Sequence, residues 1–205
     1  MEYKPSSPAQ FIGSARLYAS MLATLAEQLK RKKEPVRILL IGPPGTGKTS
    51  SSEFFLKTLG VGKWSMHKYN GTEMKIDEAC EIARSFRMPD LLGEFRALAI
   101  EEVDAVPVVA QTRLLTLLDE MTAGSVAVCT SNCSVEQLEP RFQSRFRVFE
   151  FKPPTQQEII DLLVSLGTPK REAVQIGTFC CGDVRLAIND ASNAILRAQC
   201  MAVAA

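Results

Sequence analysis

The segment Gly42-Pro43-Pro44-Gly45-Thr46-Gly47-Lys48-Thr49 decides the fold of this chain, and it directly follows the mostly apolar run Val36–Ile41. Its glycines let the backbone curl so that N–H groups point inward at an anion. The spacing is that of a P-loop, in which the lysine reaches the β- and γ-phosphates and the following hydroxyl holds Mg²⁺. A helix that begins near Lys48 adds its positive end to the site. A chance glycine turn is the alternative, but the strand before it favours a site for a nucleoside triphosphate.

The composition sets limits on partners and compartment. With 205 residues, the chain can form one large domain, or a core with a small second domain. Its formal net charge is +1, so any contact with nucleic acid must come from local patches. No run of eighteen apolar residues occurs, and residues 1–5 do not open a signal peptide. We therefore expect a cytoplasmic protein (nuclear or organellar in a eukaryote) without membrane contact.

The cysteines support the same compartment. Of the six, only Cys129 and Cys133 have a spacing close to that of metal ligands, and His67 is the single histidine. Cys129 also lies in an apolar strand pattern, which favours buried free thiols over a zinc site or disulfides. Free thiols are typical of a reducing compartment.

Strand and helix patterns alternate along the first three quarters of the chain. The predicted strands are Val36–Ile41, Trp64–Tyr69, Ala97–Ile100, Val126–Thr130 and Arg147–Phe151. The predicted helices after the first three of them are Lys48–Leu59, a stretch with Ile76, Ala79, Cys80 and Ala83 at helical spacing, and Val108 to about Met121. Such alternation predicts an α/β fold with a parallel sheet covered by helices on both faces.

The two ends of this region carry further patterns. An earlier helix-period stretch places apolar residues on one side: Leu17, Met21, Leu22, Leu25 and Leu29. The basic run 30–33 closes that helix, either as a solvated C-terminus, which cations favour, or as a DNA-binding patch. In the last strand, period-2 spacing puts Phe149 and Phe151 on one face, with Val148 and Glu150 on the other.

Lys152-Pro153-Pro154 marks the one clear boundary in the chain. Helical patterns follow it over Thr155–Leu166, Lys170–Phe179 and Asp183–Cys200. We therefore predict an ATPase-type core over residues 1–153 and a small helical lid over residues 154–205.

Acidic residues follow the apolar run Ala97–Ile100. A P-loop enzyme keeps its Mg²⁺ ligand, and the base that orients water, at the end of such a strand. Glu101 and Glu102 occupy that place, and Asp104 comes shortly after them. A solvated strand end is the alternative interpretation.

Three polar residues further along the chain are weaker candidates. Asn132 follows the next strand, where it could order the attacking water or simply form a turn. Arg145 lies just before the last strand, as a surface residue or as the guanidinium that a transferring phosphoryl group needs from a neighbour. Arg185 falls in the first turn of the last helix, for which Asp183 could be an ordinary cap.

The order of these motifs resembles the AAA+ ATPases, and within them the small clamp-loader subunits of the replication factor C type. The resemblance runs from Tyr3 to about Ala198. It rests on the following segments: Tyr3-Lys4-Pro5, the adenine-side box Phe11-Ile12-Gly13, Walker A at Gly42–Thr49, Tyr69-Asn70-Gly71-Thr72, Walker B at Glu101-Glu102-Val103-Asp104, the DNA-facing Ala110-Gln111, the first sensor in Thr130-Ser131-Asn132, the Ser144-Arg145-Phe146 finger motif, and the second sensor in Gly182-Asp183-Val184-Arg185.

The resemblance implies an oligomeric, Mg²⁺-dependent ATPase that works in DNA replication with other AAA+ subunits, DNA and a sliding clamp. Implied catalytic residues are Lys48, Glu102, Asn132 and the trans-acting Arg145. Thr49 and Glu101 would hold Mg²⁺. Implied nucleotide contacts are Ile12, Gly13, Pro44, Gly45, Thr46, Gly47, Lys48, Thr49, Ser50 and Arg185. Closing of the lid over ATP would be the coupling step.

Three departures from the family pattern keep alternatives open. Glu101 stands where the family has Asp, so the carboxylate is one methylene longer, and Phe146 replaces a Cys. The sequence ends at Ala205, before the collar domain with which clamp loaders usually continue, as expected of a truncated form or of a shorter relative. Another AAA+ machine on DNA (an initiator, helicase loader or branch-migration motor) and a catalytically silent nucleotide-binding scaffold are the rival interpretations.

Overall fold

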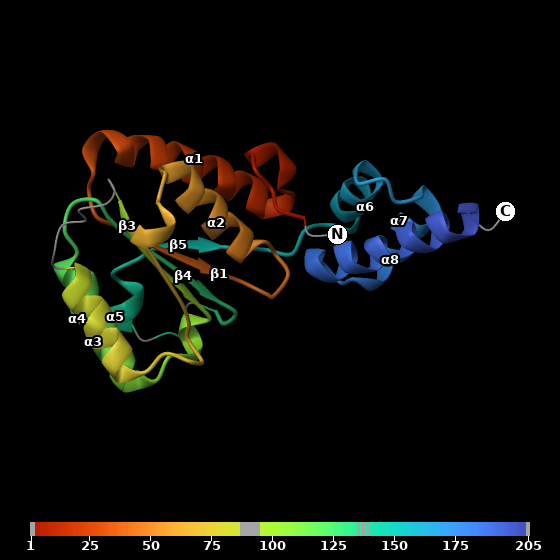
Figure 1. The fold of residues 1–205 in the computed structure, drawn as a ribbon. Helices are drawn as coiled ribbons and strands as arrows, with labels where there is room; N and C mark the ends of the chain where they lie inside the picture. Colours follow the sequence, from red (N-terminus) through yellow and green to blue (C-terminus); the bar gives the residue numbers. More distant parts are fainter. Residues whose placement is uncertain (1–2, 87–94, 135, 137, 139, 204–205) are drawn as a thin grey trace.

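A five-stranded sheet forms the centre of the protein. The computed structural model describes residues 3–86, 95–134, 136, 138 and 140–203 (Figure 1). The strands are β1 (Val36–Ile41), β2 (Met66–Asn70), β3 (Arg96–Glu101), β4 (Ser125–Ser131) and β5 (Arg147–Glu150). They lie in the order β2-β3-β4-β1-β5, and every neighbouring pair is parallel, as the sequence predicts. The carboxyl ends of all five strands therefore meet at one edge.

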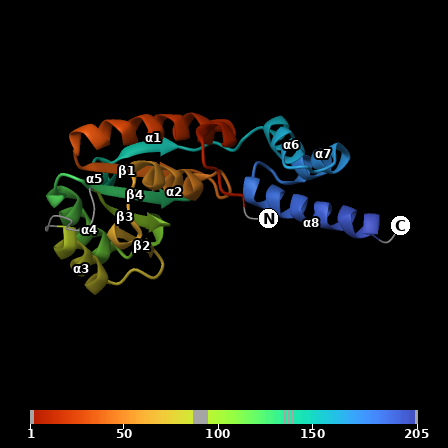
Figure 2. The same ribbon diagram turned by 45° about the horizontal axis from the view of Figure 1, so that its top comes forward.

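Helices cover both faces of this sheet. On one face lie α1 (Gly13–Lys32) and α2 (Lys48–Leu59), and on the other lie α3 (Ile76–Phe86), α4 (Val108–Glu120) and α5 (Pro140–Gln143) (Figures 1 and 2). Successive residues of β1 serve the two layers in turn: Ile38 and Leu40 join the cluster under α1 and α2, whereas Leu39 and Ile41 join the cluster under α3 and α4. The predicted fold class is confirmed.

The buried face of α1 differs from the predicted one. Leu22, Leu25 and Leu29 are buried as expected, but Leu17 is 60% exposed and Met21 is 48% exposed. The buried stripe is completed instead by Ala15, Ala19 and Ala26, which share the helix face with the three leucines. Small side chains let α1 lie close to the sheet and to α2. The positions of the alanines therefore identify the buried face of α1 better than the number of leucines does.

The second strand begins later than predicted. Trp64 lies in a short 3₁₀ turn, η2 (Lys63–Ser65), and is 89% exposed. The Ser65 N–H donates to the Gly62 carbonyl at 3.1 Å and closes this turn. Pairing with β3 starts only at Met66, because β2 is an edge strand whose extent is set by its single partner.

The predicted faces of the last strand are confirmed, whereas the prediction of buried thiols is confirmed only in part: Cys129 and Cys180 are buried, but Cys181 and Cys200 are exposed. Phe149 and Phe151 are buried, while Val148 and Glu150 on the opposite face are exposed. Cys129 is a buried free thiol, and burial raises its pKa far above the usual range. Within the described ranges, no group of three or more His, Cys, Asp or Glu side chains is placed to hold a metal ion.

The last three helices pack together beyond the sheet. They are α6 (Gln156–Ser165), α7 (Lys170–Phe179) and α8 (Val184–Val203), and they share a separate apolar cluster (Figure 2). Thr155 caps α6: its side chain accepts from the Glu158 N–H, and the Glu158 carboxylate accepts from the Thr155 N–H in return. Across the described part of the chain, no helix combines the length and the apolar character that crossing a bilayer requires.

Candidate nucleotide-binding site

The P-loop has the conformation that its glycines allow. Gly42, Gly45 and Gly47 have φ values of 141°, 72° and 93°. A side chain would not fit at two of them: a Cβ at Gly42 would collide with the carbonyl oxygen of Phe151, and a Cβ at Gly45 with the carboxylate of Asp183. α2 begins at Lys48, directly after the loop, so its free N–H groups face the same space.

The lysine of the loop is folded back onto the loop itself. Lys48 is buried, and its Nζ donates to the carbonyl oxygens of Gly42 and Pro43, each at 2.7 Å. Burial, and to a smaller extent the nearby charge of Arg185, lower the pKa of Lys48 to about 8, against the opposing effect of Asp104, Glu102 and Asp183. An anion beside this ammonium would favour its charged form.

Two strand ends bring the acidic candidates to the P-loop. Glu101 ends β3, and Glu102 follows in a left-handed conformation with φ 54° and ψ 52°. The Glu102 N–H donates to Thr130 Oγ1 at 3.3 Å, which joins it to β4. Asn132 Nδ2 donates to Glu102 Oε1 at 3.4 Å, and the Asn132 N–H donates to Asp104 Oδ1 at 3.3 Å. A left-handed non-glycine residue held by such partners is typical of a functional position.

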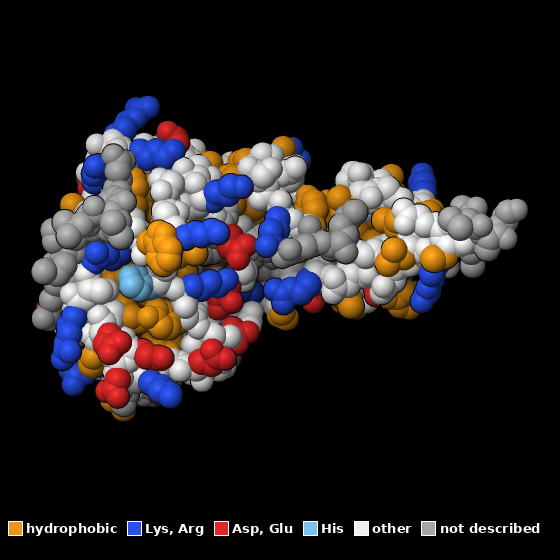
Figure 3. Space-filling view, in the orientation of Figure 1, with side chains coloured by type: hydrophobic (Ala, Val, Ile, Leu, Met, Phe, Trp, Pro, Cys, Tyr) orange, Lys and Arg blue, Asp and Glu red, His pale blue; other side chains and the backbone are white. Residues whose placement is uncertain are grey.

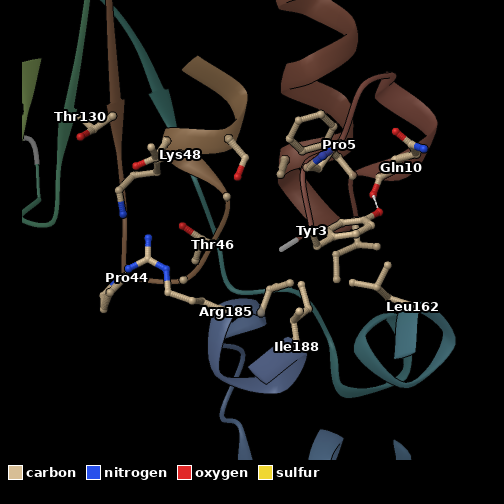
Figure 4. Close-up of a pocket in the computed structure, with 18 of the residues that line it drawn as sticks. Tyr3, Pro5, Gln10, Pro44, Thr46, Lys48, Thr130, Leu162, Arg185 and Ile188 are labelled. Carbon is tan, nitrogen blue, oxygen red and sulfur yellow. Dashed lines mark hydrogen bonds between the residues drawn. The ribbon is translucent and has the colours of Figure 1, made fainter. Parts of the chain in front are cut away.

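A cavity of about 410 Å³ connects these groups. It lies between the P-loop, the N-terminal segment and the C-terminal helices (Figure 4). Among the residues predicted to form the site, all except Gly13 and Arg145 line it. The volume is within the range of small-ligand pockets.

One wall of the cavity was not predicted from the sequence. Tyr3, Leu162 and Ile188 gather on the side opposite Lys48 and Thr46 (Figure 4). Leu162 and Ile188 belong to the cluster of the C-terminal helices, and their helical spacing indicates only a buried face. The cavity thus has an anion-binding end and a more apolar end, which is the arrangement that a nucleotide's phosphates and base require.

The N-terminus of α8 contacts the P-loop directly. The Val184 N–H donates to the Gly45 carbonyl at 3.1 Å, and Asp183 Oδ1 accepts from the Leu186 N–H at 3.0 Å. Asp183 is therefore the helix cap, as one interpretation predicts. Arg185, in the same first turn, lines the cavity and points toward the P-loop (Figure 4), and its role as a phosphate sensor stays a prediction.

The two predicted residues outside the cavity have other surroundings. Gly13 begins α1 with φ 55°, and a Cβ there would lie 3.1 Å from Pro154 Cβ, so it serves the junction that leads into α6. Arg145 forms a two-pronged ion pair with Asp119 of α4, with Nε–Oδ1 2.7 Å and Nη2–Oδ2 2.6 Å. Its Nη1 also donates to the Arg141 carbonyl at 2.6 Å. No pattern in the sequence links Arg145 to Asp119.

Comparisons with known proteins agree with this geometry. Residues 38–154 match the family described as the ATPase family associated with various cellular activities (AAA). The replication factor C large subunit of Thermofilum pendens is 24% identical over 200 residues, which cover 92% of this chain and 48% of that protein. The Holliday junction branch migration complex subunit RuvB of Mesomycoplasma hyopneumoniae is 37% identical over 59 residues, 29% of this chain and 19% of that protein. The chain thus spans at most about half the length of these relatives.

Solved structures show the same fold. The Thermotoga maritima RuvB Holliday junction branch migration motor superposes with a TM-score of 0.72 and 23% identity, covering 91% of this chain and 63% of that one. A variant of the same protein gives a TM-score of 0.77 at 20% identity and covers 98% of this chain and 68% of that one. At these identities, the likeness concerns the fold alone.

Proposed function

Because this chain belongs to the AAA family of ATPases, we propose that it hydrolyses ATP in a Mg²⁺-dependent reaction as one subunit of an assembly that works on DNA. The observation that supports this most is the convergence of Lys48, Glu102 and Asn132 on one cavity at the carboxyl edge of the sheet. Oligomeric AAA+ partners and ATP or ADP are part of the proposal.

Each residue would act through the chemistry of its side chain. The P-loop N–H groups, Lys48 and Arg185 would bind the phosphates. Glu102 would accept the proton of the attacking water, which Asn132 would orient through the contact that already joins the two residues. Thr49 and Glu101 offer a hydroxyl and a carboxylate at the cavity wall, a donor set suited to Mg²⁺, which would neutralise phosphate charge when bound.

We propose that residues 1–153 are the ATPase core and that residues 154–205 are a lid. The hydrogen bond from the Val184 N–H to the Gly45 carbonyl joins the lid to the P-loop. Leu162 and Ile188 are apolar residues of the lid that line the cavity. Nucleotide in the cavity would contact both parts, so lid position would depend on the nucleotide state.

The assembly that we propose first is of the clamp-loader kind, with DNA and a sliding clamp as partners in the cytoplasm. The similarity to a replication factor C large subunit over 92% of this chain supports it. A branch-migration motor is the second candidate, supported by the more identical but shorter RuvB match. A clamp loader should show ATPase activity stimulated jointly by a clamp and primed DNA, whereas a motor should respond to DNA alone.

Lys48→Ala should weaken nucleotide binding by about tenfold to a hundredfold, because it removes a charge-assisted contact to phosphate. Equilibrium binding of a fluorescent ATP analogue would measure the loss. Lys63→Ala, at an exposed lysine outside the cavity, is the matched control. Unchanged binding in Lys48→Ala would refute the P-loop assignment. In the unsubstituted protein, tight binding without turnover would instead identify a silent scaffold subunit.

Glu101→Asp should lower the Mg²⁺ concentration needed for half-maximal turnover. The family pattern has Asp at this position, and the shorter side chain confines the carboxylate more closely to the strand end. Steady-state hydrolysis across a Mg²⁺ titration would measure the change. A higher Mg²⁺ requirement in the variant would mean that the local backbone is adapted to glutamate.

A further inference from the structure

A lysine on the edge strand contacts the carboxylate that we assign to Mg²⁺. Lys68 lies in β2, where it pairs in register with Ala99, and Asn70 pairs with Glu101. Lys68 and Glu101 are therefore diagonal neighbours on the same face of the sheet. The Lys68 Nζ lies 2.9 Å from Glu101 Oε1, and 3.4 Å from Glu53 Oε1 of α2.

Glu101 stands between two hollows. On one side is the large cavity that the P-loop lines. On the other is a small cavity of about 40 Å³ lined by Lys68 and Glu53, and Glu101 belongs to the walls of both. The carboxylate thus has Lys68 on one side and the P-loop on the other.

Side-chain length decides whether this contact can form. An aspartate at position 101 would end one methylene, roughly 1.5 Å, nearer the backbone, and its carboxylate would be drawn away from Lys68. The glutamate that departs from the family pattern is therefore the residue that reaches the edge strand. An ordinary lysine is an ammonium at neutral pH, so the 2.9 Å contact with Glu101 is an ion pair.

We propose that Lys68 is a positioning residue that competes with Mg²⁺ for Glu101 and so sets a higher Mg²⁺ requirement for nucleotide binding. The inference rests on the proposed metal role of Glu101. Two effects of Lys68 both weaken Mg²⁺ binding. Its ammonium occupies one oxygen of the Glu101 carboxylate, and its positive charge repels a nearby cation. Lys68 and Glu101 are 43% and 30% exposed, so solvent screens the pair and the effect is modest, about two- to fivefold in Mg²⁺ affinity.

The test measures binding rather than turnover. Mg²⁺ is titrated against retention of a fluorescent ADP analogue, with thermal unfolding as a check that each variant is folded. We expect Lys68→Met to lower the half-maximal Mg²⁺ concentration about two- to fivefold. Lys68→Arg, which keeps the charge and the pair, should match the unsubstituted protein. Lys63→Met, an exposed lysine of η2 outside both cavities, should leave the value unchanged.

A double-mutant cycle separates this contact from a general charge effect. With Glu101→Asp in place, Lys68→Met should have a clearly smaller effect, because the shorter carboxylate no longer reaches the lysine and only the repulsion between the ammonium and the cation is left. An equal effect in both backgrounds, or a weaker Mg²⁺ affinity in Lys68→Met, would overturn the competition. If retention of nucleotide in the unsubstituted protein does not depend on Mg²⁺, the proposed metal site itself fails, and the role of Lys68 fails with it.

Discussion

Arg145→Ala should bind ATP normally and hydrolyse it about 10³- to 10⁵-fold more slowly, the range that an arginine finger contributes to phosphoryl transfer. The expectation is geometric. Arg145 lies outside the cavity that Lys48 and Arg185 line, which is why we propose that its guanidinium acts on the nucleotide of a neighbouring subunit. Charge supplied there acts mainly in the transition state, which is why binding should be preserved.

In the single chain, Arg145 is held by Asp119. The two-pronged contact fixes the plane of the guanidinium, and a neighbour's γ-phosphate would have to replace at least one of its two bonds. The ion pair is partly exposed, and solvent screening lowers the free-energy cost of such an exchange. We therefore expect Asp119 of α4 to orient the Arg145 guanidinium without preventing it from binding a neighbour's phosphate.

Mixing variants tests whether the finger acts across a subunit boundary. Lys48→Ala subunits keep an intact Arg145, so they should restore activity to Arg145→Ala subunits, whose own P-loop is intact. Turnover of the mixture, compared with each variant alone, is the measurement, and sedimentation must show that mixed assemblies form. Arg147→Ala, an exposed arginine at the start of β5, is the matched control and should retain activity. Mixed assemblies without restored activity would assign Arg145 a role in its own subunit.

Glu102→Gln should keep ATP binding while turnover falls by roughly a hundredfold or more, as expected for the loss of a general base. The amide cannot accept the proton of water, but its oxygen can still accept the hydrogen bond from Asn132. The geometry of the strand ends should therefore survive, and the loss should appear in turnover rather than in affinity. Single-turnover hydrolysis together with equilibrium nucleotide binding would separate the two.

The control for this change is Glu34→Gln, at an exposed glutamate before β1. It removes the same charge from the chain without touching the cavity, so its turnover should equal that of the unsubstituted protein. A Glu102→Gln variant that hydrolyses ATP at the original rate would show that another group activates the water.

Much of the fold and of the cavity could be predicted because the signals are local. The P-loop combines a strand, a glycine turn and a helix start within one short segment. Glu101 and Glu102 were predicted to serve the same site because they follow an apolar strand, where a P-loop enzyme keeps its acidic residues, and both line the same cavity as Lys48. The C-terminal helices were predicted from their period, and the structure adds the cap that Thr155 forms on one of them.

The sequence by itself therefore determined the strand–helix alternation, the phosphate loop and the edge of the sheet that carries the polar groups. The tertiary structure alone decided which face of α1 is buried, where β2 begins, which lid residues reach the cavity, and which partners Arg145 and Glu101 have. Asp119 and Arg145, or Lys68 and Glu101, are distant in the chain and become neighbours only through helix packing and strand register. Periodicity reports which side of an element is apolar, whereas these contacts depend on where each element is placed against the others.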